Sequence, residues 1–172
     1  MAGLEYFQGY SPEIRLQVQN LIETKRIGMV LKNRYKGEPI HQFNSDKLLF
    51  GYANSLKQKY FKNAPVLNKV QYDNKIHVMH NALGLHTAVT RVQGGKANAK
   101  IEIRIGNIFK RAPEPFLKMI VVHELAHIKE KTHNKAFYQL CTYMEPNYFQ
   151  LEFDVRLFLV QIEIEGTPFF DS

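Results

Sequence analysis

The chain has 172 residues, of which 45% are hydrophobic and 23% charged, as is typical of one globular domain with a substantial core. The single cysteine, Cys141, excludes an intrachain disulfide framework, and the lack of any apolar run near roughly 20 residues excludes a membrane span. The net charge of +7 fits either a solvated basic surface or an affinity for polyanions, so charge alone excludes neither.

Two helices are predicted in residues 1–68, which we interpret as a helical scaffold without a site. Ser11 is followed by a proline and an acid, the signature of a helix start, and Gly28 is expected to end this first helix. Asn44 or Ser45 is expected to cap the second helix.

Strand patterns begin at Val70. Residues 76–79 and 87–92 form short runs rich in β-branched side chains, and residues 99–105 alternate strictly between apolar and polar. The last two runs flank a double glycine at 94–95, which predicts a hairpin with one buried face. Three histidines in or between these strands are interpreted as partnered sheet residues and not as metal ligands: His77, His80 and His86.

Three more helices are predicted after the strands. Residues 112–115 open the first with early prolines and an acid. A second follows His133 and extends to Met144, and the last begins near Tyr148.

This order of elements predicts an α+β fold. A small antiparallel sheet packs on a central helix, with helices at the N-terminal and C-terminal ends. We expect one domain over residues 1–172. Its sheet and core helix occupy 69–148, and a C-terminal helix and tail occupy 149–172.

The strongest functional signal is His123-Glu124-Leu125-Ala126-His127, an H-E-x-x-H pattern. Residues four apart on a helix share one face, so His123 and His127 can bind one metal ion. Zinc in hydrolases takes three protein ligands and leaves a fourth position open. Glu124 lies beside that face, where it can accept a proton from water. These residues predict a metal-dependent hydrolase.

Chance is the alternative explanation of such a short pattern. The residues around it argue against chance, because Phe116, Ile120, Leu125 and Ile128 belong to a largely apolar helix that is expected to be buried. Buried histidines and carboxylates must be paired or coordinated. We therefore interpret the pattern as a metal site.

His133 is the preferred third ligand. A continued helix would turn it away from His127, so the helix must end soon after His127 and the chain must turn back. Thr132 is then expected to cap the next helix. The alternative is that His133 is a surface residue and that a carboxylate completes the site, with these candidates: Glu145, Glu152 and Asp154.

These segments resemble the YgjP-like metallohydrolases. The resemblance is carried by residues 121–138 with Glu145-Pro146 after them, and by 72–78 and 91–95 before them. More distantly, the three-histidine spacing followed by a phenylalanine is similar to Wss-type and SprT-like zinc peptidases.

The resemblance implies a zincin-like fold, with a small sheet over the metal helix. It also implies Zn²⁺ or another divalent metal on His123, His127 and His133, with Glu124 as the general base. Phe137 is expected to pack under the site.

Two activities fit such a site. The motif itself favours peptide hydrolysis, so a metallopeptidase-like activity is our first reading. The resemblance also implies the alternative, a UTP pyrophosphatase that releases UMP and diphosphate. A nucleotide substrate needs cations near the metal, and Arg91 and Arg104 of the predicted hairpin are the candidates. The other explanation of these arginines is a solvated strand face.

A DNA-associated binding module is a lesser alternative, favoured only by the positive charge. The intact Glu124 argues against it. Because the N-terminus lacks the basic and apolar regions of a signal peptide, we expect a cytoplasmic protein with no membrane contact and no disulfide-linked partner.

Overall fold

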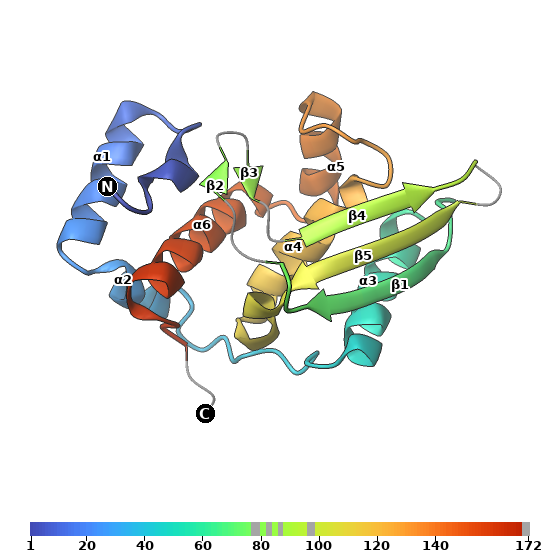
Figure 1. Cartoon of the computed structure of the whole chain (residues 1–172), viewed down its shortest axis with the longest axis horizontal. Coiled ribbons are helices and arrows are strands. Elements are labelled where there is room, and N and C mark those ends of the chain that lie inside the picture. Colours follow the sequence, from blue (N-terminus) through green and yellow to red (C-terminus); the bar gives the residue numbers. More distant parts are fainter. Residues whose placement is uncertain (77–79, 82–83, 86–87, 96–98, 170–172) are drawn as a thin grey trace.

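A computed structural model of the chain describes residues 1–76, 80–81, 84–85, 88–95 and 99–169 (Figure 1). The helices are α1 (Pro12–Glu23), α2 (Ile27–Arg34), α3 (Asp46–Tyr60), α4 (Glu114–Ala126), α5 (Lys135–Met144) and α6 (Tyr148–Glu165), with the 3₁₀ helices η1 (Leu4–Phe7) and η2 (Asn107–Arg111). The strands are β1 (Leu67–Asp73), β2 (His80–Asn81), β3 (Gly84–Leu85), β4 (Ala88–Gln93) and β5 (Lys100–Gly106).

The predicted α+β fold is confirmed, with a correction to the sheet. The strand order is β1-β5-β4, and β4 and β5 form the predicted antiparallel hairpin. However, β1 runs parallel to β5, with Val70 opposite Ile103, so the sheet is mixed and not wholly antiparallel. The long connection from β1 through β2, β3 and β4 reverses the chain before β5, which lets β5 return beside β1 in the same direction.

The helix starts follow the predicted caps. The hydroxyl of Ser11 accepts a hydrogen bond from the amide of Ile14 at 3.3 Å, and that of Ser45 accepts one from Leu48 at 3.2 Å. These bonds satisfy amides that an uncapped helix would leave open. Both predicted starts are therefore confirmed, with serine as the cap in each case.

The role predicted for Gly28 is wrong. Helix α1 already ends at Glu23, and Lys25, two residues later, adopts a positive φ of 54°. Gly28 lies inside the next helix, α2. A Cβ added to Gly28 would lie 3.2 Å from the side-chain nitrogen of Gln161 in α6. The glycine thus permits close packing of two helices and does not terminate one.

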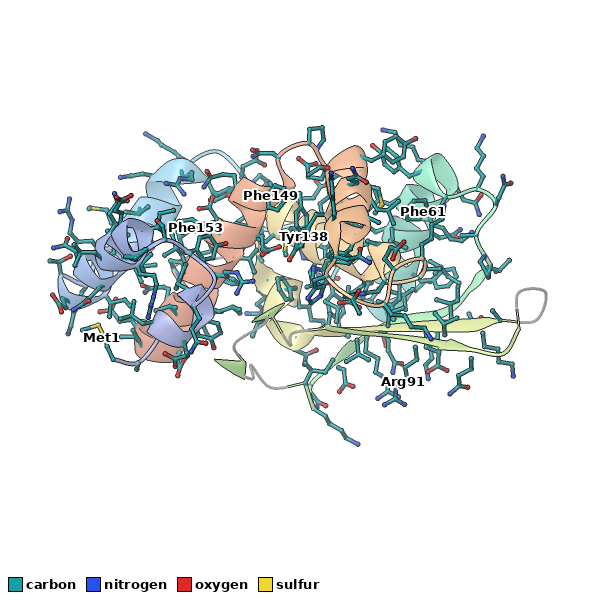
Figure 2. All side chains as sticks on the ribbon, turned by 90° about the horizontal axis from the view of Figure 1, so that it is seen from above. Met1, Phe61, Arg91, Tyr138, Phe149 and Phe153 are labelled. Atoms are coloured by element: carbon teal, nitrogen blue, oxygen red, sulfur yellow. The ribbon has the colours of Figure 1, made fainter. Side chains whose placement is uncertain are left out.

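Among the residues that the structure describes, helices cover one face of the sheet and leave the other face open (Figure 2). Ile101, Ile103 and Ile105 of β5 are fully buried on the covered face. Figure 2 shows the sheet nearly edge-on, with helices over one face and Arg91 projecting from the other. Helix α4 contacts β4, α5 and α6, and its residues from Met119 to Ala126 are buried. This burial fixes the position of the H-E-x-x-H segment at the centre of the molecule.

Two further predictions from the sequence concern a strand at 76–79 and a membrane span. The predicted strand at 76–79 falls on residues 77–79, which lie outside the described part of the chain, as do His77 and His86. None of the helices in the described part of the chain has the length and apolar character that a membrane span requires.

Candidate active site

The last turn of α4 carries the site, and the chain turns back directly after it. The helix ends at Ala126, with His127 as its cap residue. The amides of Lys129 and Glu130 both donate to the carbonyl of Ala126, at 3.1 and 3.0 Å. These bonds close a tight turn without glycine or proline, so the chain returns towards the helix end.

The next helix begins where the turn closes. Asn134, and not Thr132 as predicted, caps α5, because its side-chain oxygen accepts a hydrogen bond from the amide of Phe137 at 2.8 Å. Asparagine is as good a helix cap as serine or aspartate and better than threonine. The shift leaves His133 just before the helix, beside the end of α4.

Three imidazoles converge at this point. Nε2 of His127 lies 3.2 Å from Nε2 of His123 and 3.1 Å from Nε2 of His133. Nitrogen ligands about 2.0–2.1 Å from a tetrahedral zinc ion stand roughly 3.3–3.4 Å apart. The ligand atoms of the three histidines all lie within 4.8 Å of one another, so their spacing suits one metal ion.

The protonation of the rings also suits a metal. Burial lowers the pKa of His123 well below its ordinary value, and the neighbouring histidines lower it further. Burial also lowers the pKa of His127, while its hydrogen bond to the Glu130 carbonyl opposes that effect. Neutral imidazole is the form that binds metal ions.

Hydrogen bonds to Nδ1 orient the rings of His123 and His127, and for His127 the bond also selects the tautomer. Nδ1 of His127 lies 2.9 Å from the carbonyl oxygen of Glu130, which can only accept, so Nδ1 carries the proton. Nδ1 of His123 lies 2.7 Å from the hydroxyl of Tyr148. Such partners turn the Nε2 lone pairs towards the metal position and fix the ring planes.

Phe137 forms the floor of this group, as expected. Its ring centroid lies 4.9 Å from that of His123, 4.6 Å from that of His127 and 4.9 Å from that of His133. Phe137 is fully buried. The apolar ring therefore supports the imidazoles without offering a competing ligand.

Glu124 is held by the sheet. The hydroxyl of Thr90 in β4 lies 2.6 Å from Oε2 of Glu124 and 3.0 Å from its backbone carbonyl. Burial raises the pKa of Glu124 to about 7, and the Thr90 hydrogen bond works in the opposite direction. A carboxylate with a pKa near the working pH is well suited to general-base catalysis.

The carboxylates considered as alternative third ligands all have other partners. Glu145 forms an ion pair with Lys118. Asp154 accepts hydrogen bonds from Arg34 and Tyr35, and Glu152 accepts one from Arg156 at 3.0 Å. Within the described residues, the three histidines form the only group of acidic, cysteine or histidine side chains that could hold a metal ion. The geometry therefore favours His133.

The structure does not bring Arg91 and Arg104 to the histidines. Both alternate with the covered residues of their strands and lie on the opposite face of the sheet, as Figure 2 shows for Arg91. Nη1 of Arg104 lies 3.2 Å from Oδ2 of Asp73 on β1. Neither side chain is directed at the metal position.

Several residues of the site were missed in the sequence. Thr90 stands in the predicted hairpin, and the two-residue period of its strand was the signal that it faces α4. No sequence pattern near Tyr148, at the start of the last helix, indicated that it contacts His123.

Comparison with known proteins agrees with this geometry. A family model described as the YgjP-like metallopeptidase domain matches residues 69–154. The chain is 60% identical over 164 residues to the UTP pyrophosphatase of Escherichia coli (strain K12), covering 95% of this chain and 97% of that protein. No solved structure matches significantly.

Proposed function

The chain belongs to the YgjP-like family, and from this premise we propose that it is a metal-dependent UTP pyrophosphatase that releases UMP and diphosphate. The observation that carries the proposal is the 60% identity to a UTP pyrophosphatase over nearly the whole length of both chains. This similarity supports the alternative activity better than the metallopeptidase reading that the motif favours on its own. Both activities, pyrophosphatase and metallopeptidase, are those of a metal-dependent hydrolase.

The metal is held by His123, His127 and His133 in this proposal, with zinc as the first candidate. Three nitrogen donors whose ligand atoms lie within 4.8 Å of one another match the ligand set of a catalytic zinc site. When bound, such a cation supplies a Lewis acid that lowers the pKa of water and withdraws charge from a phosphate oxygen.

Glu124 is the general base. Its carboxylate accepts a proton from the attacking water, and the new P–O bond forms as the α–β phosphoanhydride linkage breaks and diphosphate leaves. Thr90 holds Oε2 of Glu124 at 2.6 Å and so limits the rotation of the carboxylate. Phe137 and the surrounding core exclude bulk water from one side of the histidines.

The charge of the substrate is matched by the loop that carries His133. Lys131 and Lys135 are exposed, and two residues of chain span at most about 7 Å, so both lie near the third ligand. A triphosphate carries several negative charges and needs cations beside the metal, whereas a peptide bond does not. We assign phosphate binding to these lysines in place of Arg91 and Arg104.

The test is a parallel assay of metal-loaded wild type and Glu124→Gln on two substrates. UTP should be converted to equal amounts of UMP and diphosphate by the wild type, measured by ³¹P NMR. Glu124→Gln should bind metal and lose most of this activity. A denatured protein such as casein should remain intact under the same conditions.

The metallopeptidase reading is the second candidate, supported by the metal geometry and by the domain description of the family. It predicts the reverse pattern in the same assay. Cleavage of casein without UTP turnover would overturn the proposal. UTP turnover that persists in Glu124→Gln would remove that residue from the mechanism.

A further inference from the structure

Three polar residues form a stripe along helix α6. Tyr148, Glu152 and Arg156 are spaced by four residues, so their side chains lie one turn apart on one face of the helix. Tyr148 is fully buried, and Glu152 is 7% exposed. Burying a carboxylate and a guanidinium is costly even when they are paired. The stripe therefore needs an explanation beyond packing.

The stripe begins at a candidate metal ligand. Nδ1 of His123 lies 2.7 Å from the hydroxyl oxygen of Tyr148. Nε2 of His123 lies 3.2 Å from Nε2 of His127, and when it offers its lone pair to a metal ion, the one proton of the neutral ring is on Nδ1. His123 therefore donates to Tyr148, and the O–H of Tyr148 is left to donate elsewhere.

Glu152 offers the next acceptor. Its Oε1 accepts a hydrogen bond from Nη2 of Arg156 at 3.0 Å. Its Oε2 is buried and has no hydrogen-bond partner among the residues that the structure describes. A tyrosine hydroxyl carries its proton at neutral pH, so Tyr148 can donate towards Glu152.

Arg156 holds the far end of the stripe. Its Nη1 donates to the backbone carbonyl of Tyr6 at 2.8 Å, and its guanidinium carbon lies 5.8 Å from the ring centre of Tyr10. A planar guanidinium with two fixed partners has little freedom to rotate. Glu152 is therefore held in place from behind, and Tyr148 with it.

We propose that Tyr148, Glu152 and Arg156 are positioning residues for the metal site. They keep His123 in the tautomer and ring orientation that direct Nε2 at the metal, and they make the imidazole a stronger donor. This inference rests on the proposed metal site but not on the choice between a nucleotide and a peptide as substrate.

A purely structural role would leave a different signature. In that case the stripe would only join α6 to the N-terminal segment that contains Tyr6, and its loss would lower the melting temperature without changing the metal affinity of the folded protein. Metal affinity is therefore the readout that separates the two roles.

The experiment measures zinc binding to full-length protein by competition with a chelating dye, without substrate. Tyr148→Phe removes one hydroxyl and keeps the ring. Its zinc dissociation constant should rise about 10–100-fold, the effect typical of lost outer-sphere partners of a metal-bound histidine. Tyr143→Phe is the matched control, because Tyr143 is 62% exposed, and its affinity should equal that of wild type.

Glu152→Gln provides a second, independent test should Tyr148→Phe fail to fold. It should weaken zinc binding in the same direction. The double variant should lose less than the product of the two separate effects, because both act through His123. The visible spectrum of bound Co²⁺ should change in Tyr148→Phe and not in Tyr143→Phe.

Wild-type zinc affinity in folded Tyr148→Phe, or in Glu152→Gln where that variant alone folds, would overturn the inference. A wild type that binds no zinc would overturn both this inference and the proposed function. A wild type that binds zinc but does not hydrolyse UTP would refute only the pyrophosphatase, and the affinities would still decide the role of the stripe.

Discussion

The two faces of the small sheet differ although they share the same strands. On the covered face, Thr90 donates to Glu124 and the isoleucines of β5 pack on the helices. On the open face, Arg91 is exposed and Arg104 pairs with Asp73. Thr90 and Arg91 are neighbours in sequence, so a step of one residue separates the site from solvent.

This difference shows that the role of a strand residue depends on which face of the sheet its side chain occupies. Arg91 and Arg104 of the hairpin were predicted to bind phosphate because a nucleotide substrate needs cations near the metal. Both arginines lie on the face of the sheet that points away from helix α4, whereas the uncharged Thr90 lies on the opposite face and contacts Glu124, the proposed general base.

Replacement of His133, on the covered side of the sheet, should abolish metal binding and catalysis. His133→Ala leaves two of three ligands, so metal should be lost together with all UTP hydrolysis. Elemental analysis of purified protein measures the metal, with Arg91→Ala on the open face as the control. A full equivalent of zinc in His133→Ala would contradict the three-histidine site.

Replacement of the base should separate chemistry from binding. Glu124→Gln keeps the size and hydrogen-bonding capacity of the side chain but cannot accept a proton. Metal content should stay at the wild-type level while kcat falls about 10²–10⁴-fold, the usual contribution of general-base catalysis. Loss of metal from this variant would instead make Glu124 part of the metal site.

Removal of the Thr90 hydroxyl should give an intermediate effect. Thr90→Val keeps the shape and the strand propensity and deletes the hydrogen bond to Glu124. Hydrogen bonds to charged groups contribute about 1.5–3 kcal/mol, so kcat should fall roughly tenfold to a hundredfold. Steady-state kinetics with a parallel metal assay test this, and unchanged kcat would show that Glu124 needs no support from β4.

The lysines beside His133 should affect substrate binding alone. The double variant Lys131→Ala/Lys135→Ala should lower kcat/KM for UTP about tenfold, and the loss should shrink as salt screens the wild type. Metal content should not change. An unchanged kcat/KM for UTP at low salt would argue against phosphate binding by these residues.

The open face should give the smallest effect. Arg91→Ala and Arg104→Ala are expected to leave UTP turnover unchanged, and Arg104→Ala should cost about 1 kcal/mol in unfolding free energy, because it removes a partly buried ion pair with Asp73. Kinetics and urea unfolding measure both quantities. A tenfold loss of UTP turnover in either variant would break the distinction between the two faces.

Local signals in the sequence predicted much of this fold. The caps at Ser11 and Ser45 and the hairpin across 87–105 depend on contacts between near neighbours, which the sequence displays directly. The role of Gly28 and the parallel pairing of β1 depend on partners far along the chain, such as Gln161 and β5. The spacing of apolar residues in a segment does not show which distant helix or strand will pack against it.

The site divides in the same way. His123, Glu124 and His127 stand together in one helical segment, so their chemistry could be predicted from spacing. His133 needed a turn without glycine or proline, whose closure depends on carbonyls at the end of α4. Tyr148 and Thr90 come from other elements, and only the folded chain brings them to the histidines.

The bond between Arg156 and the carbonyl of Tyr6 spans 150 residues and bears on the order of events during synthesis. Residues around Tyr6 leave the ribosome long before α6 has been made, whereas the three histidines can meet as soon as α4 and the following turn have emerged. Contacts between distant segments form late because long loops must close first. A nascent chain would therefore present its histidines before their support exists, and full metal retention would be gained only after translation has passed α6.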